Sequence, residues 1–120
     1  MENRRMTKIA DSFLQAAEQL VREEGSNILI GTTLKRRAEI IGGYRCNSIL
    51  PSDYCYNYIN KARYSCRNPL FVRKARNEYE FIGADARYNG PLTWRKADGS
   101  EKQVGVWING ILTMFEDLRE

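Results

Sequence analysis

The chain has 120 residues, of which 42% are hydrophobic and 28% charged, with a net charge of +4. This length and composition predict one globular domain, residues 1–120, and argue against a disordered chain. No apolar run approaches the roughly 18 residues that span a bilayer. The N-terminus also has no apolar signal segment, so the sequence predicts a cytoplasmic protein, of a cell or an infected host, with no membrane partner.

The residue types argue against an enzyme. Histidine, the commonest general base and a usual zinc ligand, is absent, and the three cysteines cannot supply four thiolates. Glu78 and Glu80 would share one face of a strand, but neither they nor Asp53 have a convincing nuclease-like spacing to a lysine. The sequence therefore predicts a non-enzymatic protein without catalytic residues, metal or cofactor.

Positive charge is concentrated in the middle of the chain. Between Leu34 and Arg76 there are ten Lys and Arg residues and only two acids, a surplus of eight positive charges, whereas acids outnumber bases in the flanks. Such a concentration in one folded section indicates a polyanionic partner. The alternative is a solvated face that only keeps the protein soluble.

The first part of the chain predicts two helices joined by a short apolar segment. Thr7 to Glu24 has apolar residues at helical spacing and is followed by a glycine. Residues 27–31 predict an edge strand or an extended link. A second helix is expected to start at Thr32 or Thr33, whose hydroxyls can cap it, and to end at a pair of glycines.

A third helix is predicted after Pro51, which suits the first helical position. Cys55, Ile59 and Ala62 follow at i, i+4 and i+7 and form a narrow apolar stripe. If that stripe faces the core, the polar side of the helix points outward and can read bases or hold phosphates. Its candidate binding residues are Ser52, Tyr56, Asn57, Asn60, Lys61 and Arg63.

Residues 70–74 and 78–82 are strand-like and predict a hairpin with a basic tip. Three helices followed by a hairpin is the order of a winged helix-turn-helix, an α+β fold that would occupy residues 7–82. The basic residues expected to hold phosphates in this fold are Lys35, Arg36, Arg37, Arg73, Lys74 and Arg76.

Residues 83–120 predict a C-terminal extension of strands. Asn109-Gly110 lies between two alternating apolar runs, which is the strongest short signal for a hairpin. A helix over residues 101–118 is the alternative, because Ser100 and Gln103 imitate a capping box. Two internal glycines would each cost that helix about 1 kcal/mol relative to alanine, so strands are favoured.

Leu50 to Asn57 (LPSDYCYN) resembles a motif in a family of small uncharacterised winged-helix-like domains. Those domains occur in phages, in mobile elements and near or within restriction-type defence proteins. Tyr88 to Pro91 and Val106 to Gly110 are similar to further parts of the family pattern. The resemblance implies a helix-turn-helix-like domain acting on or around DNA and implies no catalytic residue. Family members often carry a histidine after the Gly-Pro turn, where this chain has Trp94 nearby instead.

These observations predict a non-enzymatic protein that binds double-stranded DNA. One such module buries about 600–1,000 Å², so tight specific binding would require a homodimer or a fused partner. The alternative is a small phage-encoded inhibitor, such as an anti-CRISPR, that contacts a nuclease or another defence protein. Tyrosine and arginine, frequent in this chain, are common anchors of protein interfaces.

Overall fold

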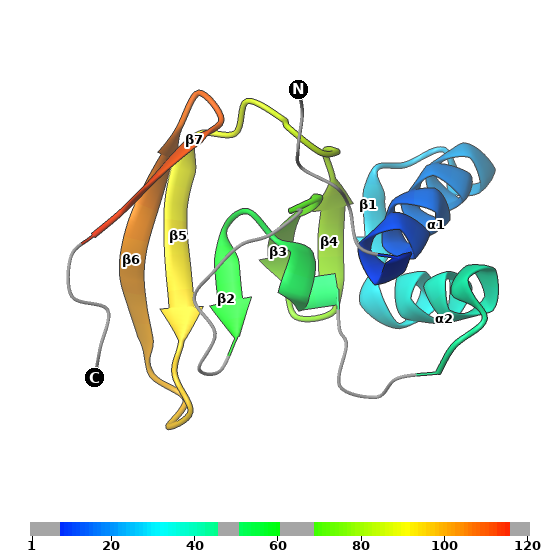
Figure 1. Cartoon of the computed structure of the whole chain (residues 1–120), viewed down its shortest axis with the longest axis horizontal. Coiled ribbons are helices and arrows are strands. Elements are labelled where there is room, and N and C mark those ends of the chain that lie inside the picture. Colours follow the sequence, from blue (N-terminus) through cyan, green and yellow to red (C-terminus); the bar gives the residue numbers. More distant parts are fainter. Residues whose placement is uncertain (1–7, 46–50, 61–68, 116–120) are drawn as a thin grey trace.

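The computed structural model describes residues 8–45, 51–60 and 69–115, except for the side chain of Asn60. These residues form two helices and seven strands arranged in two sheets (Figure 1). No described helix is long and apolar enough to cross a bilayer. In chain order the elements are α1 (Lys8–Glu24), β1 (Ile28–Ile30), α2 (Gly31–Gly42), the 3-10 turn η1 (Pro51–Tyr54), β2 (Tyr58–Asn60), β3 (Phe71–Ala75), β4 (Glu78–Phe81), β5 (Gly90–Arg95), β6 (Glu101–Ile108) and β7 (Ile111–Met114).

The predicted winged helix-turn-helix is wrong, because the expected third helix does not form. After the single turn of η1 the chain becomes extended, forms an isolated bridge at Cys55 and continues into β2. Tyr56 and Tyr58 are buried along with Cys55 and Ile59, so this segment has no outward polar face of the kind a surface helix needs. Contacts with distant strands override the local helical spacing.

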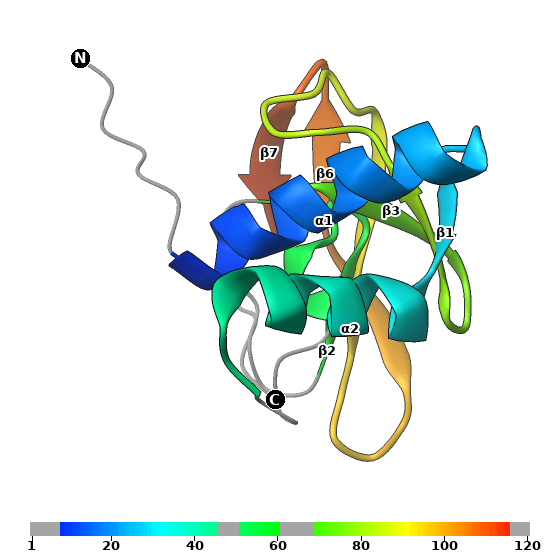
Figure 2. The same cartoon turned by 90° about the vertical axis from the view of Figure 1, so that its right-hand side faces the viewer.

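The first sheet has the order β1-β4-β3 and is covered by the two helices (Figure 2). The prediction of α1 is confirmed over its described length, and residues 27–31 do contain an edge strand. The hairpin predicted at residues 70–82 also forms, as β3 and β4. β1 pairs with β4, so this hairpin belongs to a three-stranded sheet, and without the expected third helix it is not the wing of a winged helix-turn-helix. Phe13, Leu29 and Phe71 lie in the core between sheet and helices.

The N-terminus of α2 is capped by a residue from the β3–β4 turn. Neither predicted threonine caps the helix: the N-cap position is Ile30, which makes no side-chain hydrogen bond. Instead the Gly31 N–H donates to the Asn77 carbonyl (2.9 Å), and the Thr32 N–H donates to Asn77 Oδ1 (3.0 Å). Asn77 adopts a left-handed φ of 64°, which asparagine tolerates better than most residues.

Asn77→Gly is expected to lower the free energy of unfolding by about 1 kcal/mol, the usual value of a lost cap, since glycine keeps the left-handed backbone. Asn77→Ala should cost about 1 kcal/mol more, because a Cβ is unfavourable at that φ. Urea unfolding of both variants measures the two contributions. An Asn77→Gly protein as stable as the original would show that the cap contributes nothing.

Residues 54–60 form the seam between the two sheets. On one side, the Leu70 N–H donates to the Tyr54 carbonyl and the Tyr56 N–H to the Phe71 carbonyl, both at 2.8 Å. Further along, β2 turns to the other side and pairs in parallel with β5. The strands therefore follow one another across the molecule, with the helices at one end (Figure 1).

The second sheet has the order β2-β5-β6-β7 and has its own core. Tyr56, Leu92, Trp94 and Trp107 are central members of this cluster. The strand prediction for the C-terminal region is confirmed, and the alternative helix is excluded. The hairpin at Asn109-Gly110 has a positive φ at both turn residues, 53° and 84°, as a type I′ turn requires.

Candidate nucleic-acid interface

The described side chains that were predicted to read bases are used inside the fold. Ser52 is 5% exposed and Tyr56 is 1% exposed. Asn57 is half-buried, and its amide binds the backbone of Arg73 in both directions. Asn57 Nδ2 donates to the Arg73 carbonyl (2.9 Å), and the Arg73 N–H donates to Asn57 Oδ1 (2.8 Å). The expectation that Ser52 and Tyr56 face outward is therefore wrong, and the partly exposed Asn57 has its amide bound to Arg73.

Several predicted phosphate-binding side chains have partners within the protein. Lys35 pairs with Glu39 at 2.8 Å, and Lys74 lies 3.6 Å from Glu80. The Arg73 guanidinium lies over the ring of Tyr58, 4.4 Å from its centroid. These side chains are less available to a ligand than their position in the sequence suggests.

Arg37 is held most firmly. Its guanidinium donates to both carboxylate oxygens of Glu23, at 2.8 and 2.9 Å, and to Gln19 Oε1 at 2.9 Å. This hydrogen bonding raises the pKa of Arg37 and lowers the pKa of Glu23. Arg37 thus links α2 to α1, and its side chain remains partly exposed to solvent.

An open pocket of about 690 Å³ lies at the C-terminal part of α2. Three of its lining residues are cations, and its single carboxylate, Glu39, already pairs with Lys35. Arg36 and Arg45 are exposed and form no ion pair with any residue in the described ranges. The lining residues are Lys35, Arg36, Glu39, Ile40, Gly43, Tyr44 and Arg45.

A rigid turn places Arg45 beside this pocket. The helix ends at Gly43, which has a left-handed φ of 71° and donates its N–H to the Glu39 carbonyl. Ser12 Oγ donates to the Ile9 carbonyl (2.7 Å), so the Tyr44 hydroxyl, 2.7 Å from Ser12 Oγ, is the donor of that second bond. A Cβ at Gly42 would clash with the Tyr44 ring, which explains the glycine there.

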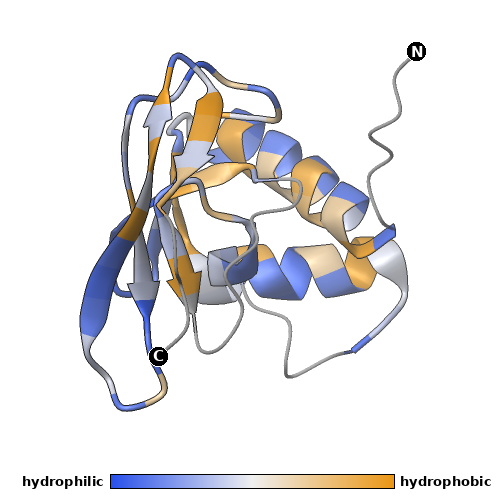
Figure 3. Cartoon of the chain, turned by 60° about the vertical axis from the view of Figure 1, so that its left-hand side comes forward, coloured by the Kyte–Doolittle hydropathy of each residue, from blue (hydrophilic) through white to orange (hydrophobic). Residues whose placement is uncertain are grey.

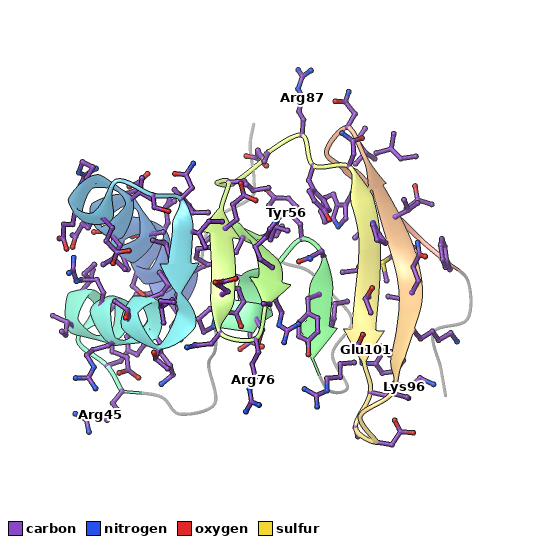
Figure 4. All side chains as sticks on the ribbon, turned by 180° about the vertical axis from the view of Figure 1, so that it is seen from behind. Arg45, Tyr56, Arg76, Arg87, Lys96 and Glu101 are labelled. Atoms are coloured by element: carbon purple, nitrogen blue, oxygen red, sulfur yellow. The ribbon has the colours of Figure 1, made fainter. Side chains whose placement is uncertain are left out.

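Other basic side chains continue along the same side of the molecule. Figure 4 shows Arg45, Arg76 and Lys96 in a row along one edge, with Arg87 at the opposite edge. Arg76 is exposed in the β3–β4 turn and has no ion pair with the described residues. Lys96 lies 5.9 Å from the centroid of the Trp94 ring, and Glu101 lies near it and reduces the local charge. We define the basic edge as Arg36, Arg45, Arg76 and Lys96.

Two of the twelve predicted residues, Arg36 and Arg76, therefore lie on the basic edge. Lys61, Arg63 and the side chain of Asn60 lie outside the described part of the chain. The sequence prediction did not include Arg45 or Lys96. Arg45 stood in the charge-rich section, but nothing in the sequence linked Lys96 to it. Within the described residues there is no group of three or more Cys, Asp or Glu that could hold a metal ion.

Comparison with known proteins gives relatives without a described activity. The family described as "Domain of unknown function (DUF7225)" matches residues 12–114. "Uncharacterized protein YnaC" of Bacillus subtilis (strain 168) is 40% identical over 76 residues, which are 62% of this chain and 28% of YnaC. The matched segment thus spans little more than a quarter of that relative. No solved structure matches the chain. The predicted phage or defence association stays a prediction.

Proposed function

The chain belongs to the DUF7225 family of domains of unknown function, and we propose that it binds the phosphate backbone of double-stranded DNA through the basic edge. The observation that carries the proposal is the alignment of Arg45, Arg76 and Lys96 along one side of the molecule (Figure 4). The longest extent of the chain, 40 Å, runs in the direction of this row. It slightly exceeds the roughly 34 Å of one DNA turn.

The mode of binding differs from that of a recognition helix. Phosphate contacts fix the position of a protein on DNA but carry no sequence information, which is read from base edges. We expected the Asn57 amide and the Tyr56 hydroxyl to reach base edges. Both groups instead form hydrogen bonds within the fold. The basic edge therefore favours binding that depends little on sequence.

Binding to a duplex of about 30 base pairs should fall steeply with salt. If the four cations of the basic edge each neutralise a phosphate, log K plotted against log salt has a slope of about −3 to −4. Fluorescence anisotropy over a salt series measures this slope. A slope near zero would contradict the proposal.

The contribution of the edge is tested with neutral substitutions. Arg45→Gln and Arg76→Gln should each weaken binding to all duplexes alike, about 3- to 10-fold, and reduce the slope by about 1. Arg87→Gln is the matched control, because Arg87 is also exposed but lies at the opposite edge. An equal loss in Arg87→Gln would mean that only net charge matters.

An acidic protein surface presents the same charge to this edge as DNA does. If duplex binding is flat with salt but the protein associates with a nuclease or defence protein, and Arg45→Gln breaks that association, the inhibitor interpretation replaces DNA binding. If the protein binds both a duplex and a defence protein through separate surfaces, the salt slope and the Arg45→Gln and Arg76→Gln duplex affinities still decide whether the basic edge binds DNA.

A further inference from the structure

Strand β7 is an open edge of the second sheet. It is the last strand in the order β2-β5-β6-β7, and on its outer side no described strand pairs with it. Edge strands of monomeric proteins are commonly protected by charges, prolines or bulges. The sequence of β7, Ile-Leu-Thr-Met, contains no charge and no proline, and its pairing with β6 is regular. The strand thus has none of these protections.

An exposed apolar surface lies beside this open edge. Ile111, 71% exposed, is the cross-strand partner of Ile108, 63% exposed. Thr113 and Phe115 follow Ile111 at the alternating positions that share its face, and Phe115 is 43% exposed. Figure 3 shows that apolar residues occupy this end of β6 and β7, whereas the start of β6 is hydrophilic.

The hydrogen bonds to β6 determine which backbone groups of β7 point outward. The Phe115 N–H donates to the Val104 carbonyl at 2.8 Å, so Phe115 turns its backbone groups toward β6. Backbone direction alternates along an antiparallel strand, and Thr113 therefore does the same. Leu112 and Met114 point their N–H and carbonyl groups away from β6, toward the open edge.

We propose that β7 pairs antiparallel with β7 of a second copy of this chain, in a register centred on Thr113. Leu112 then forms a hydrogen-bonded pair with Met114 of the second copy, using the outward backbone groups. Ile111 lies opposite Phe115 of the second copy, and twofold symmetry forms this apolar pair twice. Pairs of an aromatic and a β-branched residue are among the favourable cross-strand contacts.

A second copy suits this surface because the strand is self-complementary. An isologous interface brings each residue close to its own counterpart, so a charge near the axis would repel itself. β7 carries none. Three large apolar side chains beside this edge are exposed, those of Ile108, Ile111 and Phe115, so the contact area is small. Stable complexes bury about 800 Å² per partner, so the dimer is weak, with a Kd of about 10–100 μM.

Self-association is measured without nucleic acid, so its outcome is independent of the proposed DNA binding. Sedimentation velocity from about 5 to about 500 μM should show a reversible shift from monomer to dimer. Ile111→Lys should abolish the shift. Ile40→Lys is the matched control, because Ile40 on α2 is also 71% exposed, and it should dimerise as the original does. A monomer at every concentration, or equal effects of both variants, would overturn the proposal.

The register is tested by cross-linking. At a non-hydrogen-bonded position on the twofold axis, opposing Cα atoms lie about 4.5 Å apart, close enough for a disulfide. In a background with serine at Cys46 and Cys66, Thr113→Cys should form a disulfide dimer with oxidised glutathione, which takes up the two electrons and two protons. Thr33→Cys, exposed on α2, is the control. Cross-linking of Thr113→Cys no faster than that of Thr33→Cys would reject this register.

Discussion

Replacing Tyr56 by alanine is expected to lower the free energy of unfolding by about 4–6 kcal/mol, which is comparable with the whole stability of many domains. The ring is 1% exposed and contacts the rings of Trp107 and Tyr88, with centroids 5.0 and 5.6 Å away. Its removal leaves a cavity in the second core. It also leaves polar groups of the loop between β4 and β5 without their partner.

Tyr56→Phe separates the hydroxyl from the ring. The hydroxyl donates to the Gly83 carbonyl (2.7 Å) and accepts from the Ala86 N–H (3.0 Å), so it fastens the loop between β4 and β5 to the core. Losing both bonds should cost about 1–3 kcal/mol, because the two partner groups each lose a partly buried hydrogen bond. Urea unfolding monitored by tryptophan fluorescence measures the loss.

Tyr88→Phe is the control for the Tyr56 substitutions. The Tyr88 ring packs beside Tyr56, but its hydroxyl makes no hydrogen bond to the described residues. Removing it should change the free energy of unfolding by less than about 0.5 kcal/mol. A Tyr56→Phe protein as stable as Tyr88→Phe would contradict the role assigned to the Tyr56 hydroxyl.

The local elements of this fold were predictable because their signals are local. The apolar period of α1 and the Asn109-Gly110 turn depend only on neighbours in the sequence, and both predictions are confirmed. The third helix failed for the opposite reason. Cys55 and Ile59 have helical spacing, but they are buried in an extended segment. Within that segment Tyr56 hydrogen-bonds to Phe71, and Asn57 hydrogen-bonds to Arg73. Such long-range contacts leave no periodic signal.

The candidate site was predictable only as a region of charge. The surplus of Lys and Arg between Leu34 and Arg76 indicated a region of the chain, but whether each of these side chains is available to a ligand depends on the fold. Arg37 is bound by Glu23, a residue 14 positions earlier that lies on the neighbouring helix. Lys96 reaches the same edge as Arg45 because β5 ends there (Figure 4). Neither relation can be read from spacing along the chain.

Asn57→Ala should lower the free energy of unfolding by about 2–4 kcal/mol, the second largest effect we expect. The Asn57 amide takes the place of a neighbouring strand for Arg73, whose N–H and carbonyl it satisfies together. Alanine leaves both groups of Arg73 without this partner. Asn27→Ala is the control, since the exposed Asn27 side chain makes no hydrogen bond to the described residues and should be nearly neutral.

The same variant distinguishes a structural amide from a base-reading one. If Asn57 held a base, Asn57→Ala would change the ratio of affinities for two duplexes of different sequence. Because the amide is bound to Arg73, we expect that ratio to stay constant at temperatures where the variant is folded, while the urea midpoint falls. A changed ratio at unchanged stability would mean that the amide leaves Arg73 to contact DNA, and the seam between the sheets would then be part of the interface.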